Sequence, residues 1–109
     1  MVTSRTARSD AVFRAVADPT RREILRLLRS GGRSVGDLAS NFQQTRPAIS
    51  KHLRSLRAAG LVRTRAEGTA RICELDATPL RAIDRWLREY QALWRGSLRS
   101  LKRYVEEER

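Results

Sequence analysis

The segment from Gln44 to Arg54 carries side chains suited to contacting nucleic acid. Donors and short hydroxyls recur along it, while Ile49 and Leu53 take the inward positions of a helix. No carboxylate interrupts the outward face, although a merely solvated helix face, the alternative, normally carries both signs of charge. Such side chains match guanine edges and phosphates. The predicted DNA-contacting set is Gln44, Thr45, Arg46, Pro47, Ser50, Lys51 and Arg54.

A second group of arginines flanks the turn at Glu67-Gly68-Thr69. Arg63, Arg65 and Arg71 lie in two short runs, 61–65 and 70–75, whose composition is typical of strands. These charges either discourage strand pairing at an exposed edge or meet phosphates or a minor groove. We favour the second reading and predict that all three arginines contact DNA.

Catalytic and metal-binding constellations are not evident. His52 and Cys73 are the only histidine and cysteine, and there is no glycine-rich phosphate loop or nucleophile with a matching base. We therefore expect no enzyme activity, no cofactor and no metal site. His52 is expected to be a half-buried packing residue, with a phosphate contact as the alternative. Cys73 shares strand parity with Leu75 and is expected to be buried, with a redox role as the minor alternative.

Composition favours a polyanionic partner. The 109 residues contain 23 basic and 12 acidic side chains, a formal net charge of +11. Double-stranded DNA is the favoured partner, and an anionic membrane surface is the second candidate. One cysteine excludes an internal disulfide, and neither a signal peptide nor a membrane span is recognisable, so a cytoplasmic protein is expected.

The predicted elements place both groups of arginines on one small domain. A short helix over 11–17 precedes a helix opened by Asp18-Pro19 and stopped at Gly31-Gly32. Helices over 35–42 and 45–59 follow, then the hairpin, then a long helix from Thr78-Pro79 to about Glu107. The fold class is mainly α (α+β): a winged helix-turn-helix with a two-stranded hairpin wing and a long C-terminal dimerisation helix. We divide this single domain into a core, 11–76, and a dimerisation helix, 77–109.

The long helix predicts a homodimer. At about 1.5 Å per residue it would reach roughly 40 Å, more than the preceding domain can cover, although it could also fold back on its own domain. Its apolar side chains recur at spacings of three and four and include aromatic residues suited to a buried interface. The predicted interface consists of Phe13, Ile83, Trp86, Leu87, Tyr90, Trp94, Leu98 and Leu101.

Three motifs together resemble the ArsR/SmtB family of bacterial repressors. They are the strings Asp18-Pro19-Thr20-Arg21, Ser50-Lys51-His52-Leu53 and Ala59-Gly60-Leu61-Val62. The resemblance implies a homodimeric repressor on an operator near its own promoter, usually released when a ligand or metal binds. The two-fold symmetry of such a dimer predicts an inverted-repeat operator. The segments that hold metal ligands in metal-sensing members lack Cys and His here, so the chain resembles the metal-free, autorepressor-like branch. The alternative function is a winged-helix protein–protein interaction module without specific DNA binding.

Overall fold

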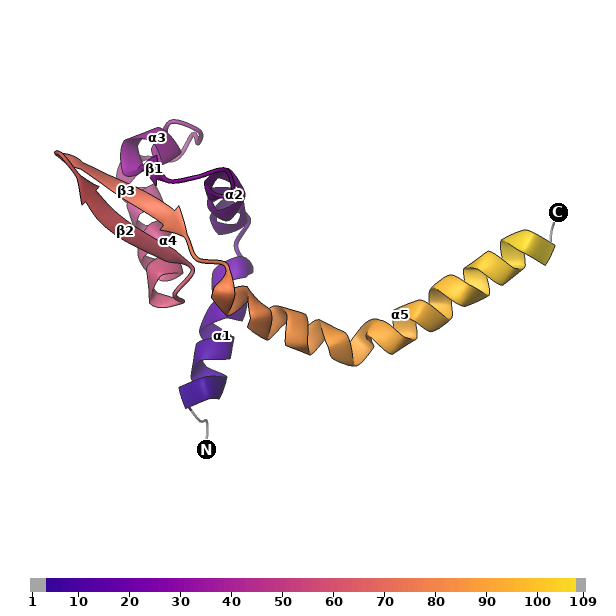
Figure 1. Ribbon diagram of the computed structural model, residues 1–109. Coiled ribbons are helices and arrows are strands. Elements are labelled where there is room, and N and C mark those ends of the chain that lie inside the picture. The colour runs from indigo at the N-terminus through magenta and orange to yellow at the C-terminus, as the bar shows by residue number, and fades with distance from the viewer. Residues whose placement is uncertain (1–3, 108–109) are drawn as a thin grey trace.

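The computed structural model describes residues 4–107, and Figure 1 shows a small winged-helix body from which one long helix projects. The helix-turn-helix is formed by α3 and α4, and the wing is the hairpin of β2 and β3, so the predicted fold class is confirmed. The elements in chain order are α1 (Ser4–Val16), α2 (Pro19–Leu28), β1 (Arg33–Ser34), α3 (Val35–Ala39), α4 (Arg46–Ala58), β2 (Val62–Glu67), β3 (Ala70–Leu75), a 3₁₀ turn (Thr78–Leu80) and α5 (Arg81–Glu107).

The junction between α1 and α2 is closed by hydrogen bonds at both helix ends. The Asp18 side chain accepts a hydrogen bond from the backbone N–H of Arg21, which caps the first turn of α2. In the other direction, Arg21 donates from its side chain to the carbonyl oxygens of Ala15 and Arg14, and Arg22 donates to that of Val16. The unpaired carbonyls at the end of α1 thus find partners on α2. The segment Asp18–Arg22 therefore fixes the angle between two helices.

The sheet has three strands, one more than the predicted hairpin. The strand order is β1-β3-β2, and β1 pairs antiparallel with β3 through Arg33–Cys73 and Ser34–Ile72. The backbone at Gly32 passes so close to β3 that an added Cβ would lie 2.8 Å from Cγ2 of Ile72. The predicted two-stranded hairpin is therefore present as the wing. A short third strand, which was not predicted, joins it to the start of α3.

Three predicted helix boundaries also differ. The first helix begins at Ser4 within the described residues, before the expected start at residue 11. The helix expected over 35–42 ends at Ala39 with Ser40 as its cap, because the N–H groups of Asn41 and Phe42 bond only three residues back, as in turns. The long helix is preceded by a 3₁₀ turn at Thr78–Leu80.

The hydrophobic core lies between the helices and the inner face of the hairpin. Cys73 is fully buried in it, as predicted from its strand parity. Burial also raises the pKa of the Cys73 thiol, while the nearby Arg57 and Arg71 oppose that shift. The core comprises Val12, Ala15, Ile24, Leu25, Leu28, Leu38, Ile49, Leu53, Leu56, Leu61, Val62 and Cys73.

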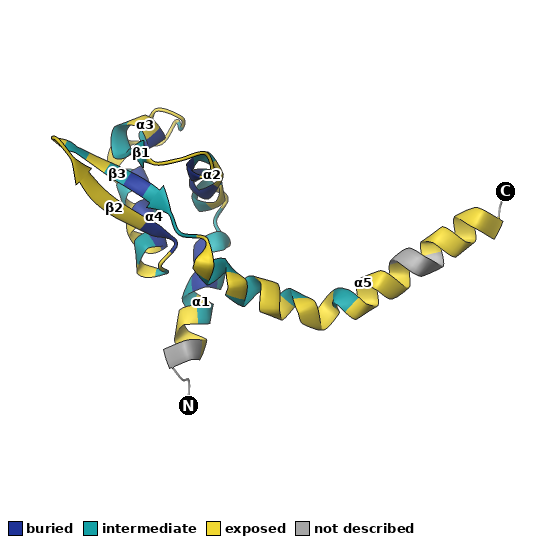
Figure 2. Cartoon of the chain, in the orientation of Figure 1, coloured by how far each residue is buried: buried dark blue, intermediate teal, exposed yellow. Residues whose placement is uncertain are grey.

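Helix α5 leaves this core after its first turn. Among the described side chains of α5, Ile83 packs against the core together with the preceding Leu80, and Trp86 meets Phe13 of α1. Figure 2 shows the later part of the helix as mostly exposed. The radius of gyration is 18.7 Å, whereas a compact chain of this length has about 13 Å. The helix therefore does not fold back on its own domain. No helix among residues 4–107 is long and apolar enough to cross a membrane.

Candidate nucleic-acid interface

Helix α4 presents a buried face and a basic face. Ile49, Leu53 and Leu56 are almost completely buried against the core and fix how the helix is rotated. Thr45 caps its start by accepting a hydrogen bond from the backbone N–H of Ala48, at 3.3 Å. The remaining predicted contacts on this helix are outward: Arg46, Pro47, Lys51 and Arg54 are exposed and Ser50 is half-buried.

Two predicted contacts at the start of α4 are already engaged within the chain. Nε2 of Gln44 donates to Oγ1 of Thr20 at 2.7 Å and so ties the α3–α4 turn to α2. The Thr45 hydroxyl accepts as the helix cap, which leaves its own proton able to donate to a phosphate. Both residues therefore position the helix whether or not they also contact DNA.

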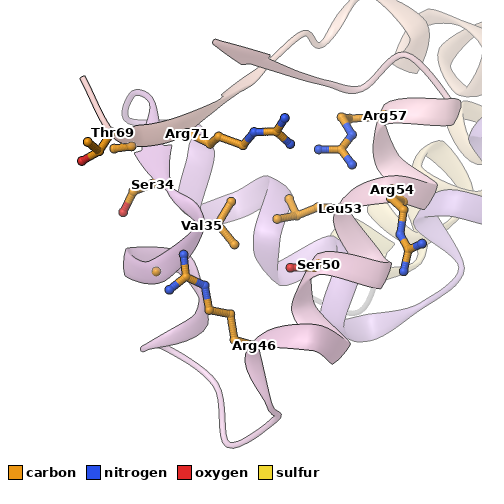
Figure 3. A pocket seen from close by; sticks show the side chains of 11 residues that line it. Ser34, Val35, Arg46, Ser50, Leu53, Arg54, Arg57, Thr69 and Arg71 are labelled. Carbon is orange, nitrogen blue, oxygen red and sulfur yellow. The ribbon is translucent and has the colours of Figure 1, made fainter. Parts of the chain in front are cut away.

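A groove of about 650 Å³ runs between α4 and the wing, and Figure 3 shows the side chains that line it. Arg57 of α4 and Arg71 of β3 extend toward one another across it, while the Arg46 guanidinium lies against α3. Gly36 lies beside that guanidinium, and a Cβ there would make an ordinary van der Waals contact with Nη1 of Arg46, at 3.8 Å. The lining residues are Ser34, Val35, Gly36, Arg46, Ser50, Leu53, Arg54, Arg57, Thr69, Ala70 and Arg71.

The groove is suited to a phosphate backbone. Four arginines and three hydroxyls line it, and no carboxylate is among the described residues that do so. Arginine and hydroxyl donors are the usual partners of phosphate oxygens. Arg57, Ser34 and Thr69 were not predicted as contacts. Arg57 could have been, because it extends the spacing of Arg46, Ser50 and Arg54 along one face of α4.

The wing divides the three predicted arginines between its two faces. Arg71 pairs directly with Ala66 and shares the face of Cys73, which brings it into the groove beside α4. Arg63 and Arg65 pair with Glu74 and Ile72 and lie on the opposite face, because strand side chains alternate. The structure thus joins Arg71 to the recognition surface of α4 and leaves Arg63 and Arg65 on the outer face of the wing.

Arg65 is held between two carboxylates. Its Nε lies 2.7 Å from Oε1 of Glu74, and its Nη1 lies 2.7 Å from Oε2 of Glu67. These bonds raise the pKa of the guanidinium, with Glu67 the larger cause and Glu74 the second. Two negative charges beside one positive charge weaken the attraction of this part of the wing for phosphate. Arg63 is exposed. The pKa of Asp76 is lowered mainly by a hydrogen bond from the backbone N–H of Thr78, and the charge of Arg63 lowers it further.

On a single chain, the predicted dimer residues are only partly covered by other side chains. Phe13 meets Trp86 edge to face at 5.5 Å, and Trp86 meets Tyr90 at 5.4 Å. Phe13, Ile83 and Leu87 are half-buried, whereas Trp86, Tyr90, Trp94 and Leu101 are exposed. The predicted contact Leu98 has a side chain that lies outside the described residues.

His52 and Cys73 occupy packing positions. His52 is half-buried on α4, with Nδ1 3.7 Å from Oδ2 of Asp18. Cys73 is buried in the core. Within residues 4–107, His, Cys, Asp and Glu side chains do not gather in groups of three that could hold a metal ion.

Comparison with known proteins decides the family. Residues 18–64 match the model of the arsR family of bacterial regulatory proteins. The HTH-type transcriptional regulator Rv2034 of Mycobacterium tuberculosis is 45% identical over 74 residues, 68% of this chain and 69% of that protein. The chain belongs to the ArsR family. A further relative is the transcriptional repressor SdpR of Bacillus subtilis, 38% identical over 70% of this chain and 84% of that protein.

Two solved structures of related transcriptional regulators agree with this chain in fold. An ArsR-like transcriptional regulator from Rhodococcus sp. RHA1 has a TM-score of 0.71 at 32% identity, covering 94% of this chain and 96% of that one. The homodimeric winged helix-turn-helix domain of Mb0332 from Mycobacterium bovis has a TM-score of 0.65 at 27% identity, covering 83% and 90%. The resemblance predicted from the sequence is therefore confirmed, and the chain is a DNA-binding transcriptional regulator of the winged helix-turn-helix type.

Proposed function

We propose that this ArsR-family protein is a cytoplasmic homodimeric repressor that reads an inverted-repeat operator with α4 and grips the flanking backbone with the wing. The observation that carries the proposal is the groove between α4 and β3, which four arginines line without a carboxylate among the described residues. A groove of this kind accepts one sugar-phosphate strand while the N-terminal end of α4 enters the major groove.

The residues of the groove divide into two roles. Arg46 and Ser50 lie in the first turns of α4, the part of a recognition helix that reaches base edges, and we assign them to sequence reading. Arg57 and Arg71 extend toward one another across the groove from α4 and β3 (Figure 3), and we assign them to phosphate. Arg54 lines the groove between these groups and supports both roles. Lys51 is exposed on the same helix outside the groove lining and adds charge to this side of α4. Arg63 and, less strongly, Arg65 add charge on the outer face of the wing.

The dimer is supported by the unpartnered face of α5. Leu87, Tyr90, Trp94, Leu101 and Tyr104 recur at the spacings of a two-helix seam. Trp94 is 49% exposed and Leu101 is 61% exposed in the single chain, a large apolar surface for a protein that acts alone. The homodimeric Mb0332 domain shares the fold. Residues 77–109 would then join two copies so that both α4 helices face one side of the duplex.

Footprinting on the DNA upstream of the gene tests this function. We expect protection of an imperfect inverted repeat, with steep salt dependence and two chains per site. A variant with Arg46, Ser50, Lys51 and Arg54 all changed to Ala should lose this protection, whereas Arg88→Ala, an exposed arginine of α5 paired with Asp84, should retain it. Wild-type protection by the fourfold variant would refute α4 as the reading helix. Binding without salt dependence would favour the alternative, a protein–protein interaction module.

A further inference from the structure

A second cavity lies away from the DNA groove, where α1, the end of α4 and the start of α5 meet. Its volume is about 480 Å³, within the range of about 300–1,000 Å³ usual for small-molecule sites. We call it the α1–α5 pocket. It is lined by Arg8, Ser9, Ala11, Val12, Ala58, Ala59, Gly60, Thr78, Pro79, Ala82 and Arg85.

The lining of the α1–α5 pocket is mostly apolar with positive charge at two points. Alanines, Val12 and Pro79 make its walls, and the hydroxyls of Ser9 and Thr78 add two polar groups. The guanidinium groups of Arg8 and Arg85 come from α1 and α5 respectively. Within the described part of the chain, neither forms an ion pair or a side-chain hydrogen bond, and no carboxylate lines the pocket. A ligand that fits has an apolar body and one negatively charged head.

The pocket is distinct from the apolar seam of α5. At about 100° per residue, Ala82 and Arg85 share one edge of the helix, while Leu87, Tyr90 and Trp94 lie about a third of a turn from Ala82 and about half a turn from Arg85. This separation favours a small anion over a partner helix as the occupant of the pocket.

We propose that the α1–α5 pocket binds a small amphipathic anion, with a carboxylate or phosphate-ester head on the two arginines and an unbranched apolar tail among the alanines, and that this ligand alters DNA binding. The second clause rests on the proposed function. The walls of the pocket link ligand binding to DNA binding, because they come from both helices concerned. Ala58 and Ala59 are at the end of α4, and Ala82 and Arg85 are at the start of α5. A ligand wedged between them changes the angle between the reading helix and the dimer helix, and so the separation of the two α4 helices.

Calorimetry on the full-length, DNA-free protein tests the site. The probes are decanoate and decyl phosphate, with decanol and decyltrimethylammonium as controls for tail and charge. We expect saturable binding of one anionic probe per chain and at least tenfold weaker binding of decanol. Arg8→Gln and Arg85→Gln should each raise the Kd of the anion at least tenfold. Arg81→Gln, an exposed arginine of the same helix outside the pocket, should not.

A second variant separates loss of the site from loss of the fold. Ala82→Leu should fill the pocket and abolish probe binding, while the melting temperature and the dimer mass stay near wild type. The proposal is overturned if decanol binds as well as decanoate, or if Arg85→Gln binds the anion as tightly as Arg81→Gln. It is also overturned if no probe binds and Arg8→Gln and Arg85→Gln instead weaken dimerisation, because the pocket would then hold the second copy.

The effect on DNA is measured separately by fluorescence anisotropy on the footprinted site. We expect saturating decanoate to change DNA affinity at least threefold, and DNA to change decanoate affinity by the same factor, since linkage is reciprocal. An unchanged DNA affinity overturns the coupling. Protein that binds the operator but no anion refutes the pocket alone, whereas protein that binds the anion but no DNA refutes the repressor assignment.

Discussion

Oδ2 of Asp18 lies 3.7 Å from Nδ1 of His52 while it accepts a hydrogen bond from the backbone N–H of Arg21 at 3.0 Å. One carboxylate thus joins the start of α2 to the middle of α4, the helix assigned to DNA reading. The hydrogen bond to Arg21 is the main cause that lowers the pKa of Asp18, and the charges of His52 and Arg21 lower it further against the effect of burial.

We expect Asp18→Ala to lower the free energy of unfolding by about 1 kcal/mol at neutral pH, because the first turn of α2 loses its cap. A group whose pKa is lowered by folding stabilises the protein above its unfolded pKa, here 3.8, and that contribution is lost as the pH falls through the folded value. Urea titrations compare wild type with Asp18→Asn, which keeps a capping side chain but does not titrate. Their difference in stability should shrink below pH 3.8. A difference that grows on acidification would contradict the lowered pKa.

The groove predicts two kinds of binding defect. Arg46→Ala or Ser50→Ala should cost about 1–3 kcal/mol on the preferred site and relax the sequence preference, if base edges are read there. Arg57→Ala or Arg71→Ala should instead weaken binding to all sequences alike and lower the salt slope by about one. Anisotropy titrations on matched and scrambled sites over a range of salt distinguish the two patterns. A loss of sequence preference in Arg57→Ala would reverse the assigned roles.

The two carboxylates around Arg65 should weaken the binding of the wing to DNA. Glu67→Gln combined with Glu74→Gln should tighten binding to all sequences and steepen the salt dependence, because Arg65 becomes free to meet phosphate. The control adds Arg65→Ala to this double variant and should remove most of the gain. A gain that persists without Arg65 would show that the carboxylates act only by repelling DNA.

The seam of α5 predicts that dimerisation and DNA binding fail together. Changing Leu87, Trp94 and Leu101 to polar residues should give a monomer with weakened operator binding, because each half-site then binds alone. Light scattering across micromolar concentrations and anisotropy on the same samples provide the measurement. A wild-type monomer that occupies one half-site with full affinity would refute the dimer.

Metal ions should not release the protein from its operator. The segments 34–42 and 79–109 contain no Cys or His, and zinc or cadmium sites usually depend on such ligands. Zinc, cadmium and arsenite are titrated into the preformed complex. Release at stoichiometric metal, reversed by a chelator, would disprove this expectation. Release by an oxidant would implicate Cys73, with Cys73→Ser as the control.

Local chemistry made much of the fold predictable. Asp18, Ser34 and Thr45 each cap the helix that follows them, and Gly68 takes the positive φ that the wing turn requires. Such signals lie within a few residues of what they determine. Strand β1 was not predicted, because Arg33 and Ser34 form a strand only by pairing with Cys73 and Ile72, which are distant in the sequence.

The site was predictable as a set of arginines but not as an arrangement. Spacing along α4 identified Arg46 and Arg54, and would have identified Arg57. Which face of the wing meets α4 depends on tertiary packing, so Arg71 could not be separated from Arg63 and Arg65 in advance. The capture of Arg65 by Glu67 and Glu74 likewise depends on strand register.

We expect the projecting part of α5 to make the resistance of this protein to proteolysis depend on its concentration. A solitary helix of this kind is marginal in water, because most helical stability comes from packing against other elements. An unpaired α5 should fray and be open to proteases, whereas a second chain packed on it would shield it. The rate of proteolysis should therefore fall as the concentration of the protein rises.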